Sequence, residues 1–191
     1  MKTGFFADLS EEDKEIAEYG LKQGMILAGG LILAVIAGWL LGIPGQAVLF
    51  LALSYSLRIY AGGYHATTPV RCGIISAAAI LICFLCIKYI ALPPVILHGL
   101  TLAGGLFIMR FAPVDTANKE LDEKEELAYS RMTRRIVLAE FGIYLVSALL
   151  KWEPGIRCVS VCLVLIAVNI AFGIANRKRR RLPDYDENSA L

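Results

Sequence analysis

The sequence predicts an all-α, polytopic membrane protein with about six transmembrane helices, some of them short. Of the 191 residues, 57% are hydrophobic, and the mean hydropathy of +0.62 exceeds that of ordinary soluble domains. The apolar residues form six runs that polar or proline-containing stretches separate. A run of about 20 residues can cross a hydrocarbon core of about 30 Å, whereas shorter runs need tilt or partial burial in the protein. We therefore expect one integral membrane domain over residues 1–191.

The chain starts with a polar segment, residues 1–23, which carries six acidic side chains and does not resemble a secretory signal. Ser10-Glu-Glu-Asp13 resembles a capping box in which aspartate replaces glutamate. It predicts a cytoplasmic amphipathic helix that ends near Gln23. An acidic helix would not seek anionic lipid, so it could pack on a basic protein surface or stay solvated.

The membrane domain is expected over residues 24–175. Its six spans are predicted at Gly24–Ile43, Ala47–Ser56, Gly73–Leu92, Val95–Met109, Ile136–Leu150 and Cys158–Ala175. Pro44-Gly45 and Pro93-Pro94 predict turns between spans.

Small residues recur every four positions in the first predicted span, at Gly30, Ala34, Gly38 and Gly42. Such a stripe lets another helix approach closely. That helix could belong to the same subunit or to the second subunit of a homodimer.

Basic residues predict the orientation, because short loops that carry Lys and Arg stay in the cytoplasm. With six spans, nearly all of these residues fall on one side. The exceptions are Lys88, Lys151 and Arg157. Both termini and the loop 58–72 are therefore predicted to be cytoplasmic. The same side holds a helical polar segment, 110–135, between spans 4 and 5, and a tail, 176–191, that is first basic and then acidic.

The loop from Arg58 to Cys72 is the place where the sequence looks suited to chemistry. One of only two histidines, His65, lies seven residues before Cys72. A free thiol with a pKa near about 8.5 is only slightly ionised at neutral pH, and an imidazole can raise the thiolate fraction. Gly62-Gly63 and Pro69 disfavour a continuous helix, so a folded-back loop could join the two residues. Taken alone, the pair also fits a loop at the membrane edge in which both residues are structural.

Other features of the chain are weaker evidence for a function. Two histidines supply little for a metal site, and we expect neither a metal nor a cofactor. Nucleic acid is not an expected partner, because no aromatic residues alternate with the basic cluster of the tail. The remaining cysteines lie in apolar runs, which indicates packing rather than disulfides: Cys83, Cys86, Cys158 and Cys162. Glu140, an ionisable residue in the fifth span, supports a rival interpretation as a transporter or channel, and a non-catalytic scaffold is a third.

Arg58, Gly63, His65 and Cys72, with the local sequence Gly-Gly-Tyr-His-Ala, resemble the motif of the accessory gene regulator protein B (AgrB) family of Gram-positive quorum-sensing systems. Phe111–Lys119 resembles the second polar motif of that family. The resemblance implies a cysteine endopeptidase of the bacterial cell membrane that processes the precursor of a cyclic autoinducing peptide. The implied partner is a precursor with an amphipathic leader, a short core and an acidic C-terminal tail. The resemblance also favours a homodimer.

The same resemblance implies that Cys72 is the nucleophile and His65 its base. Cys72 would release the tail through an acyl-thioester, and a cysteine or serine of the core would then close a thiolactone or lactone ring. Roles at the oxyanion, the substrate backbone or the loop are expected for Arg58, Gly62, Gly63, Thr67 and Thr68. The candidates for orienting His65 are Asp115 and Asn118. The acidic tail is expected to bind Arg131, Arg134, Arg135, Arg177, Arg179, Arg180 and Arg181.

Overall fold

A computed structural model of the chain describes residues 11–64, 68–114 and 122–181. These residues form six helices: α1 (Glu11–Leu40), α2 (Pro44–Ala61), α3 (Pro69–Tyr89), α4 (Pro94–Phe111), α5 (Glu123–Leu149) and α6 (Glu153–Arg181). The all-α prediction is confirmed, and each predicted apolar run lies wholly or mostly in a helix of its own. Within these three ranges there is no strand, and an isolated parallel bridge joins Gly62 to Val114.

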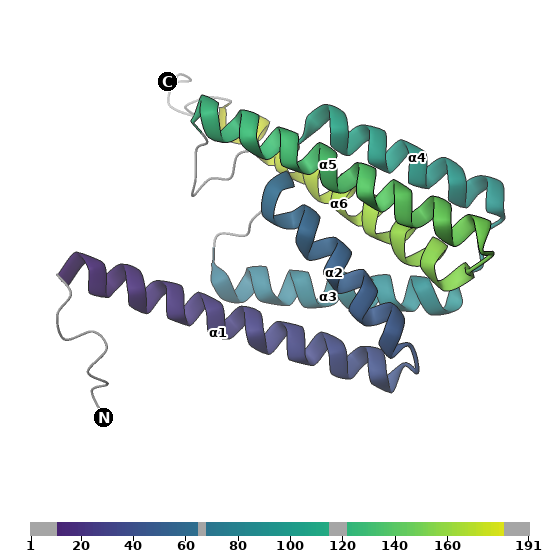
Figure 1. The fold of residues 1–191 in the computed structure, drawn as a ribbon. Helices are drawn as coiled ribbons and strands as arrows, with labels where there is room; N and C mark the ends of the chain where they lie inside the picture. The colour runs from purple at the N-terminus through teal and green to yellow at the C-terminus, as the bar shows by residue number, and fades with distance from the viewer. Residues whose placement is uncertain (1–10, 65–67, 115–121, 182–191) are drawn as a thin grey trace, which may run out of the picture.

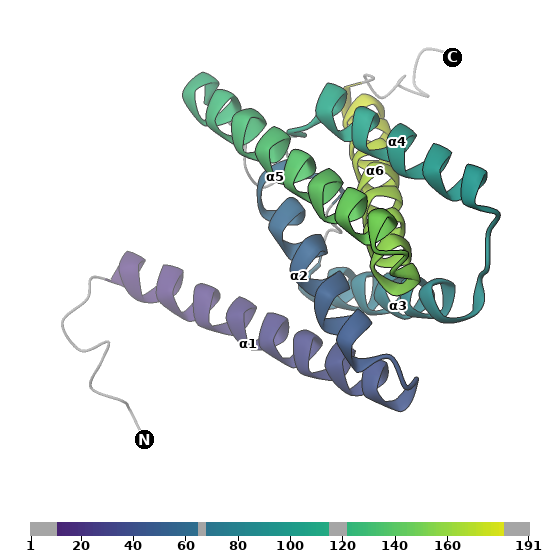
Figure 2. The same ribbon diagram turned by 45° about the vertical axis from the view of Figure 1, so that its right-hand side comes forward.

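The helices alternate in direction, so the end of α2, the start of α3, the end of α4, the start of α5 and the end of α6 lie at one end of the bundle (Figure 1). Helix α6 packs against α2, α3, α4 and α5, and Figure 2 shows it between α4 and α5. Helix α1 packs on α2 and α3, while its N-terminal half projects from the bundle (Figures 1 and 2). Fully buried side chains such as Phe50, Leu57, Ile108 and Leu163 form the core around α6.

Two predicted boundaries are absent from the structure. Helix α1 runs without a break from the acidic segment into the first apolar run, and α5 joins the polar segment to the fifth run. Neither stretch contains proline, and a single glycine such as Gly24 weakens a helix without ending it. Two elements were predicted in each of these places, and the structure has one long helix in each. The helix that was expected to end near Gln23 continues as α1. The predicted cap at Ser10 lies outside the described residues.

Three helical stretches are long and apolar enough to cross a membrane: Val70–Tyr89, Pro94–Phe111 and Glu153–Arg177. The apolar part of α1, Leu27–Leu40, is shorter. Large apolar side chains also stand exposed on α1, α3 and α4. Water would solvate such a surface poorly, whereas lipid chains solvate it well. These features fit a membrane protein.

The small residues of the first apolar run pack within the chain. A Cβ added at Gly38 would lie 2.2 Å from the Cβ of Ala47, so α1 and α2 meet at backbone distance. Ala34 is buried in the same core. Lys88, near the end of α3, donates a 2.6 Å hydrogen bond to the Leu41 carbonyl, just beyond the end of α1. Packing inside one subunit therefore accounts for Gly38 and Ala34.

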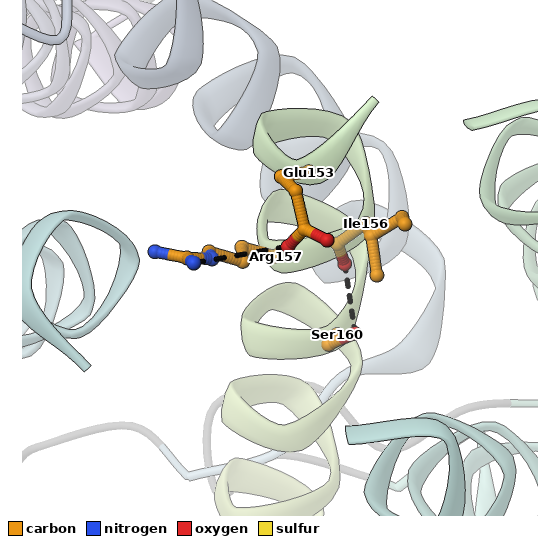
Figure 3. A network of polar contacts seen from close by, with 4 residues as sticks. All are labelled: Glu153, Ile156, Arg157 and Ser160. Carbon is orange, nitrogen blue, oxygen red and sulfur yellow. Dashed lines mark hydrogen bonds and ion pairs between the residues drawn. The ribbon is translucent and has the colours of Figure 1, made fainter. Parts of the chain in front are cut away.

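Polar contacts tie the first turns of α6 to each other and to α4, at the opposite end of the bundle from the start of α3. Arg157 lies 3.7 Å from Glu153, and the Ser160 hydroxyl donates a 2.8 Å hydrogen bond to the Ile156 carbonyl (Figure 3). Ser160 also shares a 2.7 Å hydrogen bond with the Thr101 hydroxyl of α4. These contacts anchor α6 at one end, and its other end reaches the candidate site.

Candidate active site

Two glycines end α2 and turn the chain. Gly62 has a φ of 69° and Gly63 a φ of 120°, which residues with a Cβ rarely adopt. The turn lies against the segment that follows α4. The Val114 N–H donates a 3.0 Å hydrogen bond to the Ala61 carbonyl, and a Cβ added at Gly62 would lie 2.2 Å from the Val114 oxygen. Because Val114 belongs to the second polar motif, the two motifs meet in the fold.

The backbone of Tyr64, the residue after this turn, is held from two sides. The Arg58 guanidinium donates from Nη2 to the Tyr64 carbonyl oxygen at 2.7 Å. The Tyr64 N–H donates to Asn169 of α6, both to the side-chain Oδ1 at 3.1 Å and to the backbone oxygen at 3.3 Å. Shared hydrogen bonds of this kind are common at helix ends and turns. The chain is thereby fixed immediately before His65.

Cys72 lies on the first turns of α3. Pro69 takes the first helical position, where the missing N–H costs nothing, and the Thr68 hydroxyl accepts a 3.4 Å hydrogen bond from the Arg71 N–H. The Cys72 N–H donates to the Thr68 carbonyl at 3.0 Å. The thiol is free and half-buried. Cys72 therefore lies near the partial positive charge that the N-terminus of a helix carries.

Two cavities meet at Cys72. One, of about 270 Å³, lies between α2, α3 and α6 and is also lined by Arg58, Tyr64 and Asn169. The other, of about 320 Å³, lies between α1 and α3 and has a largely apolar lining, including Phe84. Both linings are mostly apolar, and the first cavity also contains the polar groups of Arg58 and Asn169.

Arg58 connects the thiol with the turn. It is half-buried, and desolvation lowers the pKa of its guanidinium from the usual range. The neighbouring Cys72 and Tyr55 act in the opposite direction, because an anion beside the guanidinium favours its charged form. Arginine stays protonated in proteins at physiological pH, so a permanent cation lies near the thiol.

The predicted site residues that the structure describes gather at one end of the bundle. They are Arg58, Gly62, Gly63, Thr68 and Cys72. Thr68 acts as the N-cap of α3. The other predicted site residues lie outside the described ranges: His65, Thr67, Asp115 and Asn118.

The basic residues predicted to bind an acidic tail lie on α5 and α6, toward the same end of the bundle (Figure 1). Exposed side chains are those of Arg131, Arg134, Arg135 and Arg177. The last turn of α6 also contains Arg179, Arg180 and Arg181, whose side chains are not among the described ones.

Sequence reasoning missed Asn169 and Gly173. A Cβ added at Gly63 would lie 2.0 Å from the Asn169 Oδ1, and a Cβ added at Gly173 would lie 2.9 Å from the Gly63 carbonyl carbon. A signal did exist: Asn169 is the one carboxamide in the last apolar run, and Gly173 follows it on the same helix face four residues later. A polar group in an apolar run needs a partner or a role.

The structure adds little support to the interpretation of the protein as a transporter. Glu140 is buried, and neither carboxyl oxygen has a hydrogen-bond partner within the described ranges, although Cys162 of α6 lies beside it. The discontinuous helices that a transporter would use are not found among the described residues, because α1 to α6 each run unbroken. His98 contacts Tyr144 through a hydrogen bond and an edge-on ring contact.

Comparison with known proteins agrees with the resemblance of the two motifs. The family model described as accessory gene regulator B matches residues 4–173. An AgrB-like protein of Clostridium perfringens (strain SM101 / Type A) is 25% identical over 173 residues, which cover 84% of this chain and 79% of the relative. AgrB-like protein 2 of Clostridium perfringens (strain 13 / Type A) is 26% identical over 176 residues, which cover 86% and 78%. No solved structure matches the chain. The chain therefore belongs to the accessory gene regulator B family, which implies a role in the processing of an autoinducing peptide.

Proposed function

We propose that the protein is a membrane cysteine endopeptidase that removes the acidic tail of a quorum-sensing precursor and promotes cyclisation of the core. The observation that carries the proposal is the position of Cys72. Its half-buried thiol lies at the N-terminus of α3, in a cavity shared with Arg58 and with Tyr64, the residue before His65. A helix N-terminus and a nearby cation both favour the thiolate that such chemistry requires.

The reaction has two steps. His65 accepts the thiol proton, and the Cys72 Sγ attacks the carbonyl carbon at the junction of core and tail. The C–N bond breaks, the tail amine leaves with the proton from His65, and the core stays on Cys72 as an acyl-thioester. A thiol or hydroxyl of the core then attacks the thioester, which closes a thiolactone or lactone ring and releases Cys72, its sulfur again protonated.

Ring closure must outrun hydrolysis of the thioester. Well-oriented intramolecular attack corresponds to an effective molarity of about 10⁵ M or more, which exceeds the concentration of water. The two cavities beside Cys72 are partly open recesses in which a short core can be held against the sulfur. We propose that this space orients the core nucleophile and limits the access of water.

Other residues support the chemistry in this proposal. Arg58, whose charge interacts with Cys72, stabilises the negative charge that develops during the reaction. Gly62 and Gly63 maintain the turn before His65. Thr67 is the remaining candidate for the oxyanion site. Asp115 and Asn118 are the candidates for orienting His65.

The proposed topology has six spans, with both termini and the loop 58–72 in the cytoplasm. Support comes from the alternating helix directions and from the basic residues on α5 and α6 toward the end of the bundle that holds Cys72. In this orientation, the exposed arginines can hold an acidic precursor tail near the thiol. The family resemblance adds a homodimer to the proposal.

The test uses purified protein in liposomes and a synthetic precursor with an amphipathic leader, a core that contains one cysteine, and an acidic tail. Mass spectrometry should find a released tail, a cyclic core and an acyl-peptide linked to Cys72. Cys72→Ala and His65→Ala should abolish all three products. Cys86→Ala is the matched control, because Cys86 is another half-buried, free thiol of α3. Release of the tail by Cys72→Ala would refute the proposal.

A further inference from the structure

Gly63 and Tyr64, which follow the end of α2, rest on one face of α6. Asn169 and Gly173 are four residues apart and therefore lie one above the other on that helix. The Gly63 backbone approaches so closely that a Cβ at Gly173 would lie 2.9 Å from its carbonyl carbon. A Cβ at Gly63 would in turn meet the Asn169 Oδ1 at 2.0 Å. The two partners thus leave no room for a side chain between them.

The hydrogen bonds at Tyr64 fix both of the peptide groups that flank this residue. The Tyr64 N–H belongs to the peptide bond with Gly63, and it donates to Asn169. The Tyr64 carbonyl belongs to the next peptide bond, and it accepts from Arg58. Each peptide group is planar, so the two contacts restrict the backbone of Tyr64 on both of its sides.

Asn169 reaches this backbone from another part of the chain, 105 residues away in sequence. The Asn169 Oδ1 accepts the hydrogen bond from the Tyr64 N–H. The NH₂ group is the other end of the same side-chain carboxamide. Asn169 also lines the cavity that contains Cys72. Through Asn169, α6 is therefore connected both to the backbone before His65 and to the space beside the thiol.

We propose that Asn169 is a positioning residue that holds the backbone of Tyr64 so that the His65 imidazole meets the Cys72 thiol. The inference rests on the proposed function, in which His65 is the base for Cys72. Under this inference, α6 contributes to the orientation of His65, in addition to the candidates of the second polar motif. Because a misplacement of about 1 Å can cost about 100-fold in rate, loss of one backbone contact is sufficient to separate the pair.

The test compares two substitutions of similar shape. Asn169→Asp keeps a side-chain oxygen that accepts from the Tyr64 N–H, whereas Asn169→Leu leaves only the longer hydrogen bond to the backbone oxygen of residue 169. The first measurement needs no peptide substrate: the rate of Cys72 alkylation by iodoacetamide is followed against pH in the full-length protein in detergent. Mass spectrometry of the peptide that contains Cys72 separates its reaction from that of the other four thiols.

Wild type should react faster below pH 8 than His65→Ala, because the imidazole raises the thiolate fraction. Asn169→Leu should follow the curve of His65→Ala, and Asn169→Asp should retain most of the wild-type rate. In precursor processing, Asn169→Leu should lower kcat by about 100-fold with little change in KM. A merely structural role would lower the amount of folded protein and leave the pH profile of Cys72 unchanged.

A second pair of variants covers the case in which Asn169→Leu fails to fold. Gly173→Ala pushes on the Gly63 backbone, whereas Gly142→Ala adds the same methyl group to α5, where nothing lies within 4 Å. Gly173→Ala should shift the alkylation profile toward that of His65→Ala, and Gly142→Ala should match wild type.

The outcomes separate this inference from the proposed function. If His65→Ala differs from wild type while Asn169→Leu and Gly173→Ala do not, the role of Asn169 is overturned and the proposed function stands. If His65→Ala and wild type react alike at every pH, the His65 base and this inference are both refuted.

Discussion

The Arg58 guanidinium donates a 2.7 Å hydrogen bond to the backbone carbonyl oxygen of Tyr64, across the turn that ends α2. The same side chain lines the cavity that contains Cys72. Arg58 therefore has two tasks at once, since it shapes the segment before His65 and places a positive charge near the thiol. An ammonium group at this position would supply the charge without the planar fork of donors.

Arg58→Lys is expected to keep the fold and lower kcat by about 10- to 100-fold, which corresponds to the loss of a hydrogen bond from a charged group. The measurement is precursor processing in liposomes at saturating peptide. Arg110→Lys, at the end of α4, is the matched control for the general effect of this exchange. Equal kcat values for Arg58→Lys and wild type would show that the guanidinium geometry is not needed.

The contact between Gly38 and Ala47 leads to a prediction about stability. Gly38→Ala would place two methyl groups 2.2 Å apart, so it should lower the unfolding free energy by about 1–3 kcal/mol. The double variant Gly38→Ala with Ala47→Gly should recover most of the loss. Thermal unfolding in detergent measures both effects. Gly29→Ala is the control, since nothing lies within 4 Å of a Cβ there.

The same variants test the role of the small-residue stripe. If Gly38 served a contact between subunits, Ala47→Gly would not restore Gly38→Ala, and size-exclusion chromatography would show a change in oligomeric state. Recovery by the double variant, with an unchanged elution volume, is the outcome that the contact within one subunit requires.

Glu140 should be a cost to stability. Its carboxyl group is buried, and its oxygens have no hydrogen-bond partner within the described ranges. Glu140→Leu is therefore expected to raise the unfolding free energy by about 1–3 kcal/mol, because a group of similar size replaces an unsatisfied polar one. Thermal unfolding provides the measurement. An unchanged or lower unfolding free energy would contradict this view, whereas a stable variant that has lost precursor processing would assign the carboxyl group a functional role.

Reversal of the exposed charges on α5 should weaken binding of the precursor. Arg131→Glu combined with Arg134→Glu is expected to raise KM by about 10-fold with little change in kcat, since exposed ion pairs each contribute modestly. Raising the salt concentration should weaken wild-type binding in the same direction. Lys151→Glu, a reversal of an exposed charge just beyond the C-terminal end of α5, is the control. Unchanged KM values for the double variant would refute the proposed site for the tail.

Much of the fold could be predicted from local sequence. The six apolar runs predicted six helices, and Gly62-Gly63 with Pro69 predicted the break between α2 and α3. These features depend on neighbouring residues, because glycine and proline change the allowed backbone angles where they stand. The continuity of α1 and α5 was missed because polarity changed along each segment. A change of polarity marks a change of surroundings and does not by itself end a helix.

Part of the candidate site could also be predicted from local sequence, and part could not. Cys72, Arg58 and the glycines could be found as a motif, because their types and spacing lie within fifteen residues. Asn169 could not be assigned to them, since nothing local to α6 says which loop its carboxamide will meet. That contact depends on how α6 packs against its neighbours.

The sequence by itself determined that the chain forms apolar helices, where the helix-breaking turn before His65 lies, and which thiol belongs to the motif of the loop 58–72. These properties follow from side-chain polarity and from backbone preferences over a few residues. Only the tertiary structure decided that Val114 meets Gly62, that Ala47 meets Gly38, and that Asn169 holds Tyr64. Such pairs are chosen by the close packing of helices, where contact depends on the shape of the whole bundle rather than on distance along the chain.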